Sequence, residues 1–189
     1  MKRLIVGISG ASGAMYGVRL LQVLSMLPEI ESHLIISPAG RQTLALETIY
    51  SLREIQALAN VVHDFRDISA SISSGSFQTL GMVILPCSIK TLSAIVNSYS
   101  DGLLTRGADV VLKERRRLVL GVRETPLHLG HLRLMTLAAE QGAIIMPPVP
   151  AFYYLPAHVG DIIDQTVNRT LDQFDLVLPK DLFQRWQGG

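Results

Sequence analysis

The sequence has little of three features that often decide the class of a protein: cysteine, excess charge and long apolar runs. Its one cysteine, Cys87, excludes an internal disulfide and fits a reducing compartment. The 17 basic and 16 acidic residues leave a net charge of +1. Because a nucleic-acid-binding domain is expected to be strongly basic, we expect no nucleic-acid partner.

No stretch of the sequence is suited to cross a membrane, which takes about 20 mostly apolar residues. The longest charge-free stretches are 68–89, which is rich in Ser and Gly, and 141–160, which contains several prolines. Met1-Lys-Arg leads directly into an apolar strand pattern and does not resemble a signal peptide. We therefore expect no membrane span and a cytoplasmic location.

The chain is nevertheless apolar, with 48% hydrophobic residues and a mean hydropathy of +0.32. Burial between subunits explains this surplus better than a membrane segment, so the composition predicts a homo-oligomer. A length of 189 residues predicts one domain spanning 1–189.

Strand and helix patterns alternate along the chain. Short Val/Ile/Leu-rich runs predict strands at 4–8, 33–36, 61–62, 82–85, 118–122 and 143–146. Helices are expected from Met15, and at about 38–47, 52–59, 91–96, 107–114, 129–141 and 159–174. This alternation predicts a Rossmann-like α/β fold of three layers, with a mostly parallel sheet covered on both faces.

The first turn, Ser9-Gly-Ala-Ser-Gly13, joins a buried strand to a helix. Such a turn offers unpaired N–H groups and the positive end of a helix dipole, which suit a phosphate. It matches neither G-x-G-x-x-G nor the P-loop nor the nucleophile elbow. A phosphate or nucleotide turn and a plain βα turn with close-packed glycines both remain open.

Ligands of such folds lie beyond the carboxyl ends of the strands. Ser37 stands there where a dinucleotide-binding protein carries an acidic residue, which disfavours a dinucleotide; helix capping also explains it. Cys87 is expected to be a small buried residue, not a nucleophile, whereas Ser88 and Thr91 could hold a phosphate or flavin edge. Arg123 follows a strand and suits a phosphate or a flavin carbonyl.

Two further groups of residues carry weaker signals. Lys113 lies in a basic helix end that leads into the start of the next strand, so it would reach the strand-end site only from a neighbouring subunit. His128 and His131 have helical spacing for one metal but no evident third ligand, so we expect no metal site.

The motifs taken together resemble the UbiX-type flavin prenyltransferases, formerly labelled Pad-type aromatic acid decarboxylases. The resemblance covers nearly the whole chain and rests on an ordered set: Gly10-Ala-Ser-Gly-Ala14 with Tyr16-Gly17, Leu46-Glu-Thr48, Pro86-Cys-Ser88 with Thr91-Leu-Ser93, Ala108–Arg116, Arg123-Glu-Thr-Pro126, Phe152-Tyr153 and Val167-Asn-Arg169.

The resemblance implies a flavodoxin-like homododecamer that transfers a dimethylallyl group from dimethylallyl monophosphate to N5 and C6 of reduced FMN. The product would serve a UbiD-type decarboxylase, in ubiquinone synthesis or aromatic acid breakdown. The FMN contacts it implies are Gly10, Ala11, Ser12, Ser37, Ser88, Ile89, Lys90, Thr91 and Arg123. The donor contacts it implies are Lys113, Arg123, Tyr153 and Arg169.

The resemblance further makes Ser12, Glu47 and Lys113 catalytic, with a partly buried Glu47 as the acid–base residue and Ser12 next to N5. An FMN-dependent decarboxylase is the alternative. The chain departs from the family pattern at Arg117, where Pro is usual, at Pro38, where Lys is frequent, and at Tyr154-Leu155, where a His-containing pair is usual.

Overall fold

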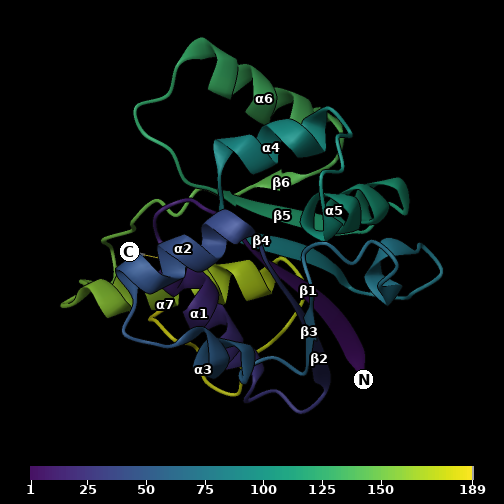
Figure 1. The fold of residues 1–189 in the computed structure, drawn as a ribbon. Coiled ribbons are helices and arrows are strands. Elements are labelled where there is room, and N and C mark those ends of the chain that lie inside the picture. The colour runs from purple at the N-terminus through teal and green to yellow at the C-terminus, as the bar shows by residue number, and fades with distance from the viewer. Residues whose placement is uncertain (189) are drawn as a thin grey trace.

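The computed structural model describes residues 1–188 and consists of six strands and seven α-helices (Figure 1). The strands are β1 (Lys2–Ile8), β2 (Ile30–Ile36), β3 (Val61–His63), β4 (Gly81–Cys87), β5 (Arg117–Val122) and β6 (Ile144–Ile145). The helices are α1 (Ala14–Leu24), α2 (Pro38–Glu47), α3 (Leu52–Gln56), α4 (Ile89–Val96), α5 (Leu103–Lys113), α6 (Leu129–Glu140) and α7 (Val159–Asp172).

All strand pairs are parallel, and the sheet order is β3-β2-β1-β4-β5-β6. Without the short edge strand β3, this is the flavodoxin-like order, in which the chain reverses direction across the sheet between β1 and β4. The predicted parallel α/β fold is therefore confirmed. The reversal leaves the turns after β1 and β4 side by side, because β1 pairs with β4.

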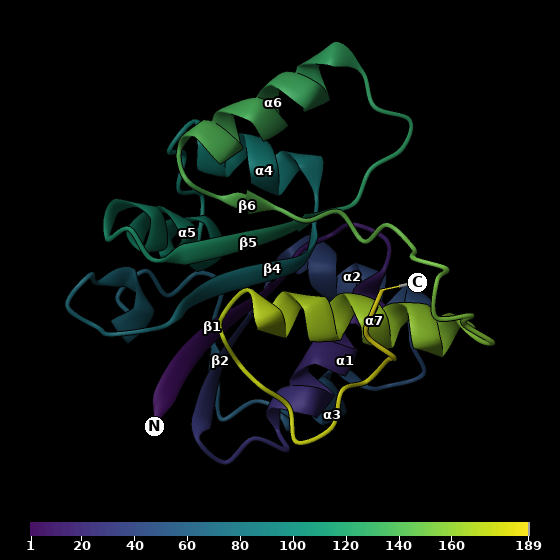
Figure 2. The same ribbon diagram turned by 180° about the vertical axis from the view of Figure 1, so that it is seen from behind.

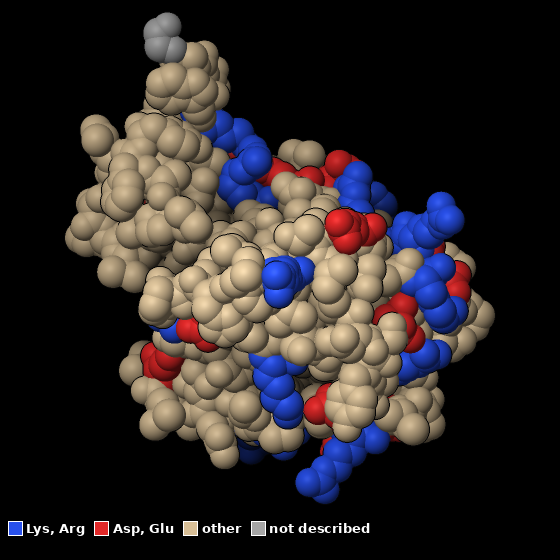
Figure 3. Space-filling model, turned by 90° about the horizontal axis from the view of Figure 1, so that it is seen from above, with Lys and Arg blue, Asp and Glu red and all other residues tan. Residues whose placement is uncertain are grey.

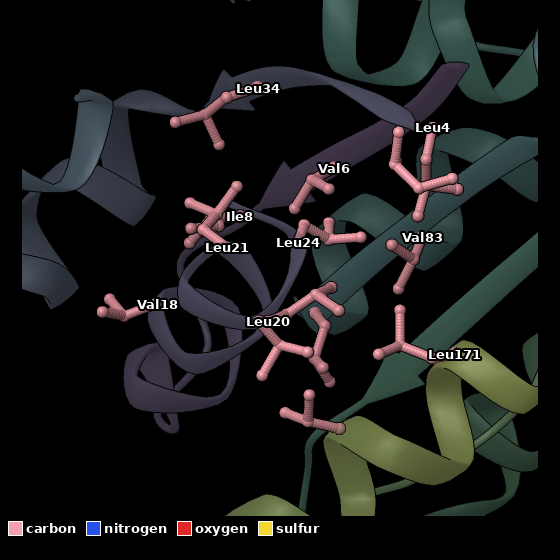
Figure 4. Packing of buried hydrophobic residues seen from close by; sticks show 14 of the residues in the cluster. Leu4, Val6, Ile8, Val18, Leu20, Leu21, Leu24, Leu34, Val83 and Leu171 are labelled. Atoms are coloured by element: carbon pink, nitrogen blue, oxygen red, sulfur yellow. The ribbon is translucent and has the colours of Figure 1, made fainter. Parts of the chain in front are cut away.

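Two hydrophobic layers enclose the sheet. Leu4, Val6 and Ile8 of β1 point to the face that is covered by α1 and α7, as Figure 4 shows. Ile5, one residue out of step, packs on the other face with α4 and α5. Figure 2 shows α7 lying along the same side as α1, opposite α4, α5 and α6. The alternation follows from the two-residue period of a strand.

Several boundaries differ from the sequence prediction; β2, for example, begins at Ile30, three residues before the predicted start. Helix α5 begins at Leu103, not at about 107, because Leu103 and Leu104 share the buried face of Ala108 and Val111. Helix α7 ends at Asp172 instead of 174, and Asp175, at a φ of 55°, turns the chain back. Helix α3 ends at Gln56 rather than 59.

No helix in the described part of the chain combines the length and the hydropathy needed to span a bilayer.

Gly17 lets α1 approach the carboxyl end of β4. A Cβ there would lie 2.5 Å from the carbonyl oxygen of Leu85 and 2.8 Å from Cδ1 of Ile8. We expect Gly17→Ala to lower the free energy of unfolding by about 1–3 kcal/mol, since a backbone oxygen cannot move aside cheaply. Gly160→Ala in α7 is the control, because a Cβ there meets nothing within 4 Å. Urea denaturation of both variants measures the free energy of unfolding. Equal midpoints of the two variants would contradict the predicted clash at Gly17.

Candidate active site

The turns after β1 and β4 are tied together by the buried side chain of Ser9. Its hydroxyl donates to the carbonyl of Pro86 at 2.9 Å and accepts the N–H of Ser88 at 2.8 Å. Its own N–H also donates to Pro86, at 3.2 Å. These bonds fix the N-terminus of α4 relative to the glycine-rich turn before α1.

Helix N-termini converge at this carboxyl edge of the sheet. Ser37 caps α2 by accepting the N–H of Gly40 at 3.0 Å, and Ser88 caps α4 by accepting the N–H of Thr91 at 3.2 Å. Capping, one of the explanations open for Ser37, is thus confirmed. The Ser37 hydroxyl can still donate its own proton, whereas that of Ser88 donates to Thr91 Oγ1 at 3.0 Å.

A cavity of about 270 Å³ lies between these helix starts. Five predicted FMN contacts line it: Gly10, Ser37, Ser88, Lys90 and Thr91. Only glycine fits at position 10, because a Cβ there would lie 2.4 Å from Cβ of Ala39. Ala11, Ser12, Ile89 and Arg123 are not among the residues lining the cavity.

The cavity has further walls that the sequence did not predict, among them Phe65, Asp101, Leu104 and Thr105. Asp101 lies 3.5 Å from the Lys90 ammonium, which brings the start of α5 beside the start of α4. The Asp101-Gly102 pair directly before Leu103 could have marked this helix start in the sequence. The prediction placed the start of α5 at about 107 and so did not connect Asp101 with the site. Phe65 follows the edge strand β3, and no motif in the sequence marked it as a site residue.

The Glu47 side chain caps the N-terminus of α1. Its Oε2 accepts the N–H groups of Gly13 at 2.7 Å and Ala14 at 3.0 Å. Gly13 has a φ of 98°, a conformation that favours glycine. The carboxylate therefore occupies the anion-binding position that the sequence offered to a phosphate.

The Glu47 carboxyl is exposed in the single chain, not partly buried as expected. Burial by itself would raise its pKa, but the neighbouring Ser12 hydroxyl and the hydrogen bonds from the N–H groups of Ala14 and Gly13 outweigh it. The positive charge of Arg123 lowers the pKa further. The net result is a pKa below the usual range, so Glu47 is ionised at neutral pH.

Cys87 is fully buried, and burial raises the pKa of its thiol to about 12. The prediction of a small buried residue is confirmed, and a buried thiol is a poor nucleophile because only the thiolate is reactive.

Tyr153 and Arg169 belong to a second cluster, beside the C-terminal tail. The rings of Tyr153 and Trp186 meet edge to face, with centroids 5.7 Å apart. Arg169 pairs with Asp172 at 2.9 Å, and Asp172 also pairs with Arg185 of the tail. Arg19 of α1 donates to Asp164 of α7 at 3.1 Å, so the helix that carries Arg169 packs against α1.

Lys113 lies at the opposite edge of the sheet. It ends α5 directly before β5, and its ammonium contacts Glu114 beside Gly75. A parallel sheet sends each helix back to the amino ends of the strands, so the fold of one chain keeps Lys113 away from Glu47.

The three departures from the family pattern have local roles. Pro38 opens α2 at its first position. Arg117 donates to the carbonyl of Gln173 and to Asp175, both at 2.6 Å. The Tyr154 hydroxyl donates to the carbonyl of Asp161 at 3.1 Å. Within residues 1–188, no three His, Cys, Asp or Glu side chains gather as a metal site.

Comparison with known proteins agrees with this geometry. Residues 1–169 match the Flavoprotein family. The flavin prenyltransferase UbiX of Escherichia coli K12 is 78% identical over 188 residues, covering 100% of both chains. The crystal structure of AnUbiX (PadA1) in complex with FMN and dimethylallyl pyrophosphate superposes with a TM-score of 0.95 at 48% identity, covering 100% of this chain and 98% of that one.

A dodecameric FMN-dependent UbiX-like decarboxylase from Escherichia coli O157:H7 superposes with a TM-score of 0.94 at 50% identity, covering 98% of this chain and 99% of that one. Because these likenesses extend over essentially the full length of both partners, the chain belongs to the UbiX flavin prenyltransferase family, within the wider Flavoprotein family.

Proposed function

We propose that this chain is a flavin prenyltransferase that transfers a dimethylallyl group from dimethylallyl monophosphate to N5 and C6 of reduced FMN. The observation that carries the proposal is the full-length identity of 78% to a flavin prenyltransferase. The ionised Glu47 at the start of α1 agrees with it. Residues 1–189 act as one flavoprotein domain in the cytoplasm, and a UbiD-type decarboxylase receives the product.

The chain's own cavity suits FMN. Its walls include the apolar side chains of Phe65 and Leu104, which suit a flat ring, and hydroxyls at two helix starts, which suit a phosphate. Gly10 packs directly against Ala39 of α2, which leaves no room for a side chain at position 10. When bound, reduced FMN supplies the nucleophilic ring atoms. The residues that hold it are Gly10, Ala11, Ser12, Ser37, Ser88, Ile89, Lys90, Thr91 and Arg123.

Glu47 acts as the base for the ring-closing proton, because its lowered pKa keeps it ionised at neutral pH. Ser12 lies beside this carboxylate and helps to lower its pKa. Tyr153, Arg169 and Arg123 hold the donor, with the two guanidiniums stabilising the charge on the departing phosphate. A monophosphate leaves with this help and needs no metal.

Lys113 acts on the donor from a neighbouring subunit, since its own chain keeps it at the far edge of the sheet. Exposed apolar residues supply surface for assembly: Leu46 (86%), Ile49 (95%), Leu155 (86%) and Val177 (86%). Figure 3 shows a broad area free of charged side chains next to the C-terminal end of the chain. Burying such area drives association, and we propose a homododecamer.

An FMN-dependent decarboxylase is the second candidate, as one similar structure carries that description. The assay that separates the two is anaerobic incubation of the protein with reduced FMN and dimethylallyl monophosphate, followed by mass spectrometry of the extracted flavin. We expect a flavin heavier by one dimethylallyl group. Bound FMN without a mass increase, with either the monophosphate or the pyrophosphate donor, would refute the prenyltransferase.

Glu47→Gln is expected to bind FMN normally and to form ring-closed product about 10²–10⁴-fold more slowly, because the amide cannot accept the proton. Single-turnover kinetics with product identification measures this. Glu29→Gln, an exposed carboxylate before β2, is the control. Normal turnover by Glu47→Gln would show that the base lies elsewhere.

Lys113→Ala is expected to lower kcat/KM for the donor about 10²-fold while leaving the FMN Kd unchanged, since it removes a cation from the leaving phosphate. Lys2→Ala removes an exposed cation as a control. Loss of FMN binding in Lys113→Ala would show that Lys113 binds FMN and not the donor. A mixture of Lys113→Ala and Glu47→Gln subunits should regain activity if the site is shared between chains.

A further inference from the structure

The C-terminal tail folds back along α7 and is held there by polar contacts. Asn168, 1% exposed, accepts the N–H of Leu182 at 2.8 Å. Figure 2 shows the tail leaving the end of α7, looping round and returning toward the start of that helix. Because Asn168 and Asp172 are four residues apart, they lie on one face of α7.

Arg185 is the centre of an ion cluster on this face. It donates to Asp172 at 2.9 and 2.8 Å and to Asp181 at 2.6 and 2.7 Å, so it binds both carboxylates in a two-pronged manner. Such geometry is stronger than an ordinary surface ion pair, and Asp172 is only 19% exposed. Arg185 lies one residue before Trp186.

Asp172 is shared between two cations. The oxygen Oδ2 that binds Arg185 also accepts a hydrogen bond from Arg169 at 2.9 Å. On the other side, Trp186 meets the ring of Tyr153, and Phe183 meets Tyr154 with centroids 5.6 Å apart. One chain of contacts therefore links Arg169 to Tyr153 through Asp172, Arg185 and Trp186.

We propose that Arg185 and Asp172 are positioning residues for the donor: their pairing latches the tail, sets Trp186 against Tyr153, and leaves Arg169 available to the donor phosphate. The role at the donor rests on the proposed prenyltransferase function; the latch itself does not. Without Arg185, the negative charge of Asp172 is no longer balanced by the tail. It then holds Arg169 more tightly and repels the anionic phosphate.

Trp186 is the only tryptophan of the chain, so its fluorescence reports on the tail alone. In the FMN-free protein, we expect Arg185→Met to raise the acrylamide quenching constant about twofold and to lower the emission anisotropy. Lys180→Met is a matched control, because it removes a cation from the same exposed tail without disturbing the described ion pairs. Equal quenching in the two variants would overturn the latch.

The coupling to the donor is tested by steady-state kinetics. Arg185→Met should raise KM for dimethylallyl monophosphate about five- to tenfold, equivalent to about 1.0–1.4 kcal/mol, with kcat and the FMN Kd changed less than about twofold. Asp181→Asn, which removes one partner of Arg185, should show a smaller rise. An unchanged KM in Arg185→Met would overturn the positioning role, even if quenching rises. If the wild-type protein transfers no dimethylallyl group, the proposed function fails, while the quenching experiment still decides the latch.

Discussion

The hydrogen bonds of Ser9 fix the geometry on which the site depends. In a parallel sheet whose strand order reverses, two neighbouring turns lead away from each other and leave a crevice between them. The Ser9 hydroxyl spans this crevice, binding Pro86 and Ser88 across 77 and 79 residues of sequence. A side chain with 0% exposure that satisfies both its donor and its acceptor is costly to remove. The starts of α1 and α4 are thereby held as one unit.

Glu47 gives the site its charge balance. Left alone, the start of α1 would attract any anion, including the phosphate groups of the ligands. With the Glu47 carboxylate bound there, the helix starts that remain at the cavity are those of α2, α4 and α5. The same hydrogen bonds hold the carboxylate in its ionised form, which is the form that a base requires. One contact thus leaves the other helix starts to an anionic ligand and fits the role of proton acceptor proposed for Glu47.

Two of the residues proposed to bind the donor come from the last third of the chain. Tyr153 follows β6, Arg169 lies on α7, and both meet the tail that returns along α7. Arg185 balances Asp172 and so connects the tail to Arg169. Lys113 is separated from them by the length of the sheet, which makes assembly of subunits part of the proposed chemistry.

The sequence by itself determined the parallel α/β fold, because its apolar strand runs and helix caps are local patterns that burial and backbone hydrogen bonding reward directly. It also placed Ser37, Ser88 and Gly10 at one edge, since strand ends in such a sheet share an edge. Only the tertiary structure decided that Glu47 binds the start of α1, that Phe65 and Asp101 complete the cavity, and that Asp172 joins Arg169 to Arg185. These contacts join residues from separate elements, and no local spacing in the sequence records the distance between two elements in space.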